Sequence, residues 1–199
     1  GTISGPLNDE LAGRFSAYRT RSDGDIKNEY NGHDLNGGSR DGFRAQLLFK
    51  PNEDFNLRWI GDYNEEDSSA GPRVLYNTGP TINGVNLYQS RANAAGATLV
   101  NGSHRKVNLD NDQHVTVHQG GTSVEANWTL PSDFTLTSIS SYRFWNFTPA
   151  NDDGLNVAAT YNAGVSVEDK QYSQEFRLAS PKGEFFDYVV GAYYFGSDL

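Results

Sequence analysis

F-N-L-R-W-I-G-D-Y-N, residues 55–64, alternates apolar and polar side chains along most of its length. Successive side chains of a β-strand point to opposite faces, so this stretch would have one apolar and one polar face. The apolar face carries Phe55, Leu57, Trp59, Gly61 and Tyr63. Residues 41–50 and 122–130 show similar alternation. The chain is therefore predicted to be all-β, with strands that have an apolar face and a face suited to water.

Proline placement supports a set of about seven predicted strands. All seven prolines of the chain lie outside these strands, as expected, because proline lacks the N–H group that a β-ladder requires. Residues 1–5, G-T-I-S-G, read as the end of a further strand. The predicted strands cover residues 11–21, 41–50, 55–64, 122–130, 134–146, 171–180 and 185–196.

Short and long connections alternate between these strands. Pro6, Pro51, Pro131 and Pro181 open short acidic turns at about residues 6–9, 51–54, 131–133 and 181–184. The connections at the other end are long and cover about residues 22–40, 65–119 and 147–170. This asymmetry is typical of an antiparallel, up-and-down transmembrane β-barrel. Residues 1–199 are therefore predicted to form a partial β-barrel wall.

Aromatic residues recur eight positions apart on the apolar face. Eight residues at ~3.3 Å per residue span ~26 Å, and a tilt of roughly 40° brings the vertical separation near ~20 Å. That separation is close to the spacing of the two aromatic girdles of a membrane barrel. A soluble two-sheet domain also alternates, so the spacing is what favours a barrel. The predicted girdle pairs are Phe55 with Tyr63, Phe134 with Tyr142, and Phe186 with Tyr194.

The polar face is predicted to line a wide, polar lumen. Arg44, Arg58 and Arg177 all fall on this face, whereas at mid-depth in lipid each would cost on the order of 2–4 kcal/mol. Arg58 with Asp62, and Glu175 with Arg177, have the same-face spacing expected of cross-strand networks that line the lumen. By the same register, the polar residues Ser138, Ser140 and Gln174 fall on the lipid side.

Composition excludes several classes of function. The net charge of −9 argues against general binding of nucleic acid or anionic membrane surfaces. The absence of cysteine excludes a disulfide scaffold and thiol chemistry. The apolar runs are far shorter than the ~20 residues of a spanning helix, so any membrane crossing is by strands. No catalytic signature places a nucleophile beside a base. We expect a non-enzyme without a cofactor.

Four stretches of the chain resemble the barrel of TonB-dependent outer-membrane receptors of Gram-negative bacteria. The clearest is Q-Y-S-Q-E-F-R-L-A-S-P, residues 171–181, followed by F-D-Y-V-V-G-A-Y-Y-F, residues 186–195. Residues 4–15 and 40–51 are similar to early hairpins of the same barrel. The resemblance covers most of the predicted strands and little of the loops.

The resemblance implies a stretch of wall from the first part of a 22-stranded barrel that is closed by an N-terminal plug. The long loops would be extracellular and the proline turns periplasmic. The function implied is energised uptake of a scarce nutrient, such as a siderophore or another large ligand, across the outer membrane. The partners implied are outer-membrane lipid, the plug and the remaining strands, with TonB recruited through an N-terminal region that this chain does not show.

Two alternatives follow from the number of strands and their alternation. Seven strands are too few, and odd in number, for a closed bacterial barrel, and open edges invite pairing with another chain. A receptor-derived fragment that assembles with copies of itself into an extracellular β-rich fibre or oligomer is therefore a second hypothesis. A secreted, carbohydrate-binding β-sandwich, whose apolar faces would meet in one core, is a third.

Candidate ligand-binding residues lie in the predicted outer loops. Aromatic and arginine side chains supply stacking and bidentate contacts; the alternative is that they are ordinary polar loop residues. No metal site is expected: His114 and His118 come nearest to one, because they share a face if H-V-T-V-H is extended, and the acidic turns, including residues 110–112, are interpreted as solvated. The candidate ligand-binding residues are Tyr30, Arg73, Tyr76, Tyr88, Arg91, His104 and Arg105.

Overall fold

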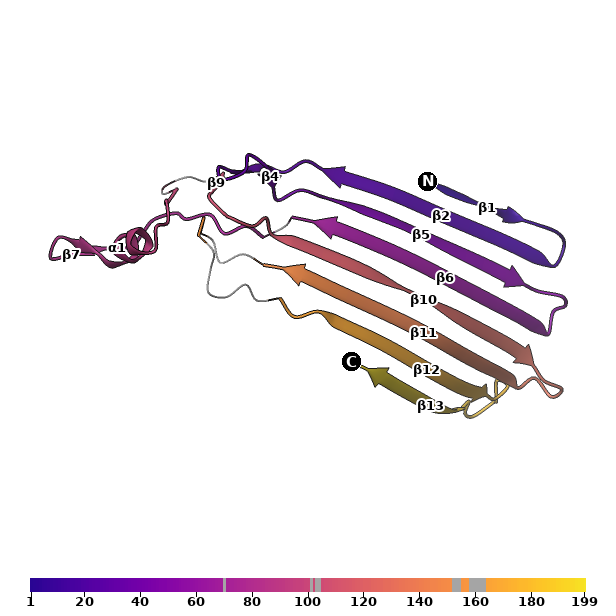
Figure 1. Ribbon diagram of the computed structural model, residues 1–199. Coiled ribbons are helices and arrows are strands. Elements are labelled where there is room, and N and C mark those ends of the chain that lie inside the picture. Colours follow the sequence, from indigo (N-terminus) through magenta and orange to yellow (C-terminus); the bar gives the residue numbers. More distant parts are fainter. Residues whose placement is uncertain (70, 101, 103–104, 152–154, 158–163) are drawn as a thin grey trace.

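The main structural element is an open, single-layered sheet of eight antiparallel strands (Figure 1). The computed structural model describes residues 1–69, 71–100, 102, 105–151, 155–157 and 164–199. The strands follow one another across the sheet in chain order, apart from short elements within the long connections. They are β1 (Thr2–Pro6), β2 (Leu11–Ser22), β5 (Gly38–Phe49), β6 (Phe55–Ser68), β10 (His114–Thr129), β11 (Thr135–Ala150), β12 (Val167–Ala179) and β13 (Val189–Asp198).

The up-and-down topology agrees with the prediction, but the number and length of the strands differ. The N-terminal residues do form a strand, β1, which raises the count to eight. The strands also extend further toward the long loops: β6 continues to Ser68, β10 begins at His114 and β12 begins at Val167. The predicted loops at 65–119 and 147–170 were therefore too long. Gly120 and Gly121 interrupt the alternation inside β10, and interior glycines weaken a strand signal.

Asparagine side chains close two of the short turns. Asn8 Oδ1 accepts hydrogen bonds from the backbone N–H groups of Glu10 and Leu11, both at 2.9 Å. Asn52 Oδ1 accepts from those of Asp54 and Phe55, at 3.0 and 2.8 Å. These local bonds hold the backbone in a turn that returns the chain antiparallel to itself.

The last turn is longer than predicted because residues 185–188 belong to it rather than to β13. Gly183 N donates to Asp187 Oδ1 at 2.6 Å, and Tyr188 N donates to Ser180 Oγ at 3.0 Å. Ser180 N in turn donates to the Tyr188 carbonyl at 2.9 Å. The predicted girdle residue Phe186 therefore lies in the turn, just before the strand.

The long connections contain small structural elements of their own. β3 (Ile26–Asn28), β4 (Asp34–Leu35) and β9 (Lys106–Val107) form a three-stranded sheet. β7 (Thr81–Ile82), β8 (Val85–Asn86) and helix α1 (Leu87–Ala94) form an arm that projects from the loop end (Figure 1). No helix among the described residues is long and apolar enough to cross a membrane.

The buried core lies in the loops and not on the main sheet. Leu35, Val107 and Leu109 are buried together, with Ile26 and Val74 packed against them. By contrast, large side chains of the main sheet are exposed, including Trp128 at 51% and Tyr194 at 67%. A β-sandwich would bury such side chains between two layers. The β-sandwich alternative is therefore wrong for the part of the chain that the structure describes.

Candidate functional site

The register of the main sheet sorts its side chains into two faces, because residues directly opposite each other on paired strands share a face. We call one the apolar face; it includes Leu47, Trp59 and Val124, which lie side by side on β5, β6 and β10. The other is the polar face; it includes Arg58 and Glu125, which are directly opposite. The polar face is the candidate functional site because its charged groups are organised into a network.

Two ion pairs cross the middle of the polar face. Arg58 Nη2 on β6 lies 2.5 Å from Glu125 Oε2 on β10. Arg143 Nη1 on β11 donates to both carboxylate oxygens of Asp62 on β6, at 2.8 and 2.9 Å. The expectation of cross-strand networks is thus met, but Arg58 and Asp62 each pair with another strand instead of with each other. Asp62 and Arg143 are not on neighbouring strands, since β10 lies between them.

Gly121 makes the second pair possible. It stands opposite both Asp62 and Arg143 in the ladder, so the space above its Cα is where the guanidinium passes. A Cβ placed on Gly121 would lie 2.2 Å from the Tyr142 carbonyl oxygen and 2.9 Å from Arg143 Cδ. A side chain at this position would therefore collide with the arginine that bridges β10.

Gly120 likewise leaves room for a contact across β10, on the apolar face. It stands opposite Tyr63 and Phe144, whose ring centroids are 6.4 Å apart across β10. A Cβ on Gly120 would lie 2.6 Å from the Asp62 carbonyl oxygen and 3.2 Å from a ring carbon of Phe144. The glycine pair therefore lets β6 and β11 contact each other on both faces of the strand between them.

Amide and hydroxyl side chains, together with a further ion pair, extend the polar network toward the short turns. Asn127 donates to Glu125 at 3.0 Å and to Asn56 at 3.2 Å, and accepts from Thr137 at 2.7 Å. Arg177 Nε lies 2.8 Å from Glu175 Oε1, a pair that runs along β12 instead of between strands. These charged and amide groups are thus paired with one another within the face.

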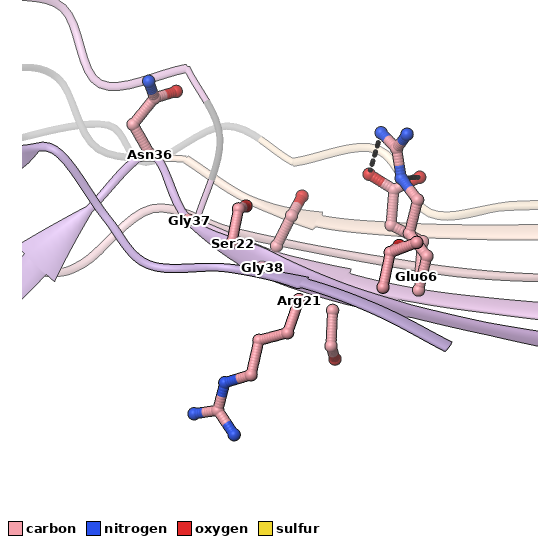
Figure 2. A pocket seen from close by; sticks show the side chains of 10 residues that line it. Arg21, Ser22, Asn36, Gly37, Gly38 and Glu66 are labelled. Carbon is pink, nitrogen blue, oxygen red and sulfur yellow. Dashed lines mark hydrogen bonds and ion pairs between the residues drawn. The ribbon is translucent and has the colours of Figure 1, made fainter. Parts of the chain in front are cut away.

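A pocket of about 260 Å³ lies where the polar face meets the long loops (Figure 2). Asn36, with φ of 70°, and Gly37 turn the chain into β5. A Cβ on Gly37 would lie 2.6 Å from Gly24 N and 2.7 Å from the Ser22 carbonyl oxygen, so the two ends of this loop meet at backbone contact. Arg40 and Glu66 form an ion pair of 3.0 Å that lines the pocket. Amide, hydroxyl and charged side chains are among the groups that line the pocket.

A row of aromatic rings crosses the apolar face near its loop end. Phe15, Phe43, Tyr63 and Phe144 follow one another with centroid separations of 6.0 to 6.4 Å. Tyr142 and Tyr172 continue the row at 5.0 Å from each other. The predicted girdle residues Tyr63 and Tyr142 belong to this row.

The other predicted girdle residues lie elsewhere on the chain. Phe55 begins β6, Phe134 lies in the turn before β11, and Tyr194 is on β13. Phe134 packs edge-on against Tyr188 at 6.4 Å, and Phe186 lies 6.4 Å from the same tyrosine. These contacts gather aromatic rings at the short-turn end.

The polar residues on the apolar face bond to one another. Ser138 is opposite Phe176 and Ser140 is opposite Gln174, in a ladder with continuous one-to-one pairing. Ser140 Oγ donates to Gln174 Oε1, and Gln174 Nε2 donates to Ser138 Oγ at 3.1 Å. Mutual hydrogen bonding lowers the cost of placing these groups on an apolar surface.

The predicted ligand-binding residues are distributed over three parts of the loops. Tyr30 lies between β3 and β4, and Arg105 precedes β9, where its carbonyl accepts from Lys27 N at 2.8 Å. Tyr88 and Arg91 are on α1 in the projecting arm. Arg73 and Tyr76 lie on the segment that leads to the arm, and His104 lies outside the described residues. The described residues among them do not form one site.

Asp112 joins two loops in a contact that the sequence analysis missed. Asn28 and Asn31 each donate to Asp112 Oδ1 at 2.9 Å, and His33 bonds to Asp112 Oδ2. Asn28 is fully buried and also bonds to both the N–H and the carbonyl of Leu109, at 3.0 Å each. The interpretation of Asp112 as a solvated turn residue was therefore wrong.

Burial alone would raise the pKa of the Asp112 carboxyl, but the hydrogen bonds from His33, Asn31 and Asn28 outweigh it and hold the pKa below its usual value. The carboxylate is thus the form that fits this site.

His114 and His118 lie on the apolar face at the loop end of β10, each with a different partner. His114 Nδ1 is 3.3 Å from Asp67 Oδ1, and His118 Nδ1 is 2.8 Å from the Tyr63 hydroxyl. Across the described ranges, no three histidine, cysteine, aspartate or glutamate side chains gather as a set of metal ligands.

One of three comparisons with known proteins found a protein of similar fold. No protein-family model matches the sequence, and no curated protein matches it. Among solved structures, the chain is similar to the ferric yersiniabactin uptake receptor FyuA from Yersinia pestis, with a TM-score of 0.69 and 17% identity. The match covers 98% of this chain and 28% of that receptor, so the chain spans about a quarter of its length. The predicted all-β, antiparallel barrel-wall fold is confirmed.

Proposed function

We propose that this chain is part of the barrel wall of a TonB-dependent outer-membrane receptor that takes up a scarce nutrient, such as a siderophore. One observation carries the proposal: the chain, of which 98% matches part of an uptake receptor, forms a single open sheet with one apolar face and one networked polar face. In a barrel, the first face meets lipid and the second lines the lumen. The plug, the remaining strands and TonB are the partners that this role requires.

The polar face fits the passage of a large hydrophilic ligand. Paired groups such as Arg58 and Glu125 are satisfied within the wall and do not compete for the ligand. Arg14 and Arg44 also lie on this face, and neither has a carboxylate partner within the described ranges. Free arginines at a lumen surface favour anionic ligands, because guanidinium groups bind carboxylates and phosphates in bidentate geometry.

Uptake of radiolabelled iron tests the proposed activity. The gene that encodes this chain is deleted in its host, and uptake of iron presented on a panel of siderophores is measured with and without dissipation of the proton gradient. Loss of one energised uptake activity, restored by the gene on a plasmid, supports the proposal. Unchanged uptake of every chelate would contradict the siderophore assignment.

Single cysteines test the proposed orientation, because the chain contains none of its own. Tyr88→Cys in the projecting arm and Glu53→Cys in a short turn are expressed in intact cells and treated with a membrane-impermeant maleimide. We expect labelling of the Tyr88→Cys protein alone, with both variants labelled after lysis. Labelling of Glu53→Cys in intact cells would reverse the orientation.

A self-assembling subunit is the second candidate function. It is favoured by the outer edges of β1 and β13, which pair with no strand among the described residues. In water, such edges pair with further strands. This candidate predicts fibres with a repeat of about 4.7–4.8 Å along the axis, whereas the receptor predicts detergent-soluble particles without that repeat.

A further inference from the structure

A groove crosses the apolar face below the aromatic row, over β1, β2, β5 and β6. Its volume is about 500 Å³. The floor is formed by Gly13 and Gly5, which stand opposite each other on β2 and β1. Leu47 stands opposite Gly13 on the other side, on β5. A Cβ on Gly13 would lie 3.5 Å from Leu7 Cδ1 and 3.6 Å from Leu47 Cδ2. Gly13 is therefore the floor between two leucine walls.

The walls of the groove are mostly apolar and open to the outside. Ile3, Phe15 and Trp59 also line the groove, together with the polar residues Ser4, Arg14 and Gln46, and Ile3 is 74% exposed. A groove of this kind suits a flexible hydrocarbon chain, since most of the surface that it offers is apolar.

A second cavity, of about 570 Å³, lies on the same face at the loop end of β2. It is lined by Arg19 and Arg21, which follow Phe15 at every second position and so share its face. Figure 2 shows the Arg21 side chain on the side of the sheet opposite to Asn36 and Glu66. The arginines thus point away from the polar face, toward the surface that carries the groove.

Three acids line this cavity: Asp34 and Asp67 each have a basic partner, and Asp23 has no ion pair in the described part of the chain. Asp34 lies 3.1 Å from Lys27, Asp67 lies 3.3 Å from His114, and Arg19 lies 3.4 Å from Asp41. Arg21 has no carboxylate partner in the described part of the chain. Its positive charge is therefore available to an anionic ligand.

The spacing between groove and cavity exceeds the thickness of the hydrocarbon of one membrane leaflet. Gly13 and Arg21 are eight residues apart on one strand, or ~26 Å, which a tilt of roughly 40° reduces to about 20 Å along the membrane normal. The hydrocarbon of one leaflet is about 15 Å thick. When Gly13 lies within the hydrocarbon, Arg21 therefore lies beyond it, on the side of the long loops.

We propose that this surface binds one anionic phospholipid of the membrane, with an acyl chain in the Gly13 groove and the headgroup phosphate on Arg21. The proposal rests on the proposed function, because it requires the apolar face to meet lipid. Arginine binds phosphate oxygens through its planar fork of N–H donors, and the groove supplies the apolar contact that free phosphate lacks.

Trp59, which lines the groove, provides a local reporter. Trp128→Phe and Trp145→Phe leave it as the one tryptophan of this chain's three. The protein that carries this chain is reconstituted in phosphatidylcholine vesicles that contain a fixed fraction of brominated phosphatidylglycerol or brominated phosphatidylcholine, and quenching of Trp59 by each lipid is compared. We expect stronger quenching by phosphatidylglycerol. Equal quenching by the two lipids would overturn the proposal.

Matched variants assign the effect to the two parts of the site. Arg21→Gln removes the cation and Gly13→Phe fills the groove, and each is expected to reduce the excess quenching severalfold. Arg44→Gln on the polar face and Ala126→Phe on a distant part of the apolar face are expected to leave it unchanged. Excess quenching that survives both Arg21→Gln and Gly13→Phe would refute the site.

One further measurement and two outcomes of the quenching experiment separate the sources of failure. Inorganic phosphate added to the buffer should leave the quenching unchanged, and displacement of the lipid by phosphate alone would contradict the role of the acyl chain. Absence of quenching by either brominated lipid would mean that the sheet does not enter the bilayer, which would overturn the proposed function as well. Equal quenching by both lipids overturns the lipid site alone.

Discussion

Arg143 on β11 and Asp62 on β6 are joined across an intervening strand, with Arg143 Nη1 at 2.8 and 2.9 Å from the two carboxylate oxygens. The contact exists because Gly121 on β10 leaves the space between them open. On the opposite face, Gly120 opens the space in which Tyr63 meets Phe144. Two adjacent glycines thus connect three strands through both surfaces of the wall.

Gly121→Ala is expected to destabilise the sheet by about 1–3 kcal/mol, because the new methyl group must displace backbone to escape the Tyr142 carbonyl. Gly13→Ala is the matched control, since a Cβ there meets its nearest neighbour at 3.5 Å, an ordinary contact distance. Urea unfolding in lipid vesicles measures both. Equal stability of the two variants would show that Gly121 is not a packing requirement.

A double-mutant cycle on Asp62→Asn and Arg143→Met measures the coupling across β10. We expect an interaction free energy of about 1 kcal/mol, because two charge-assisted hydrogen bonds are made by side chains that remain partly exposed. In the Gly121→Val background the coupling should disappear, since the valine side chain occupies the path of the guanidinium. Coupling that persists there would mean that the pair does not pass over Gly121.

The sequence predicted the faces of the sheet better than the pairs on them. Alternation places Arg58, Asp62 and Glu125 on the polar face without knowledge of neighbouring strands, because the side-chain period of a strand is local. Which acid meets which arginine depends on register between strands that are distant in sequence. Arg58 and Glu125 are separated by 67 positions, and a long, variable loop lies between them.

The loop contacts could not be predicted from local sequence patterns, because they also join residues that are distant in sequence. Asn28 and Asp112 are separated by 84 positions, and each resembles an ordinary turn residue within its own segment. The one local signal was the position of Asn28 two residues after the apolar Ile26, a spacing that puts both on one face of an extended segment. The first half of β10 was not predicted either, because Gly120 and Gly121 break the alternation of apolar and polar side chains. Both glycines nevertheless have a structural role in that strand.

Val124→Arg and Ser123→Arg test which face meets lipid. The two residues are adjacent on β10 and point to opposite faces; Val124 is opposite Trp59, between the two ends of the apolar face. Arginine on the lipid face near mid-depth costs on the order of 2–4 kcal/mol. We expect that loss of unfolding free energy in vesicles for Val124→Arg and little change for Ser123→Arg. The reverse order would assign lipid to the polar face.

Acid should release the loop contact at Asp112. Its folded-state pKa is lowered, so its contribution to stability is fully present above the usual aspartate pKa of about 3.9 and is lost as the pH falls through the folded-state value. Hydrogen exchange, corrected for the intrinsic effect of pH, should show protection at Asn28 and Leu109 that is constant near neutral pH and falls in this acidic range. Asp112→Asn removes the titrating group and should abolish this pH dependence. The same acid-induced loss in Asp112→Asn would assign the transition to another group.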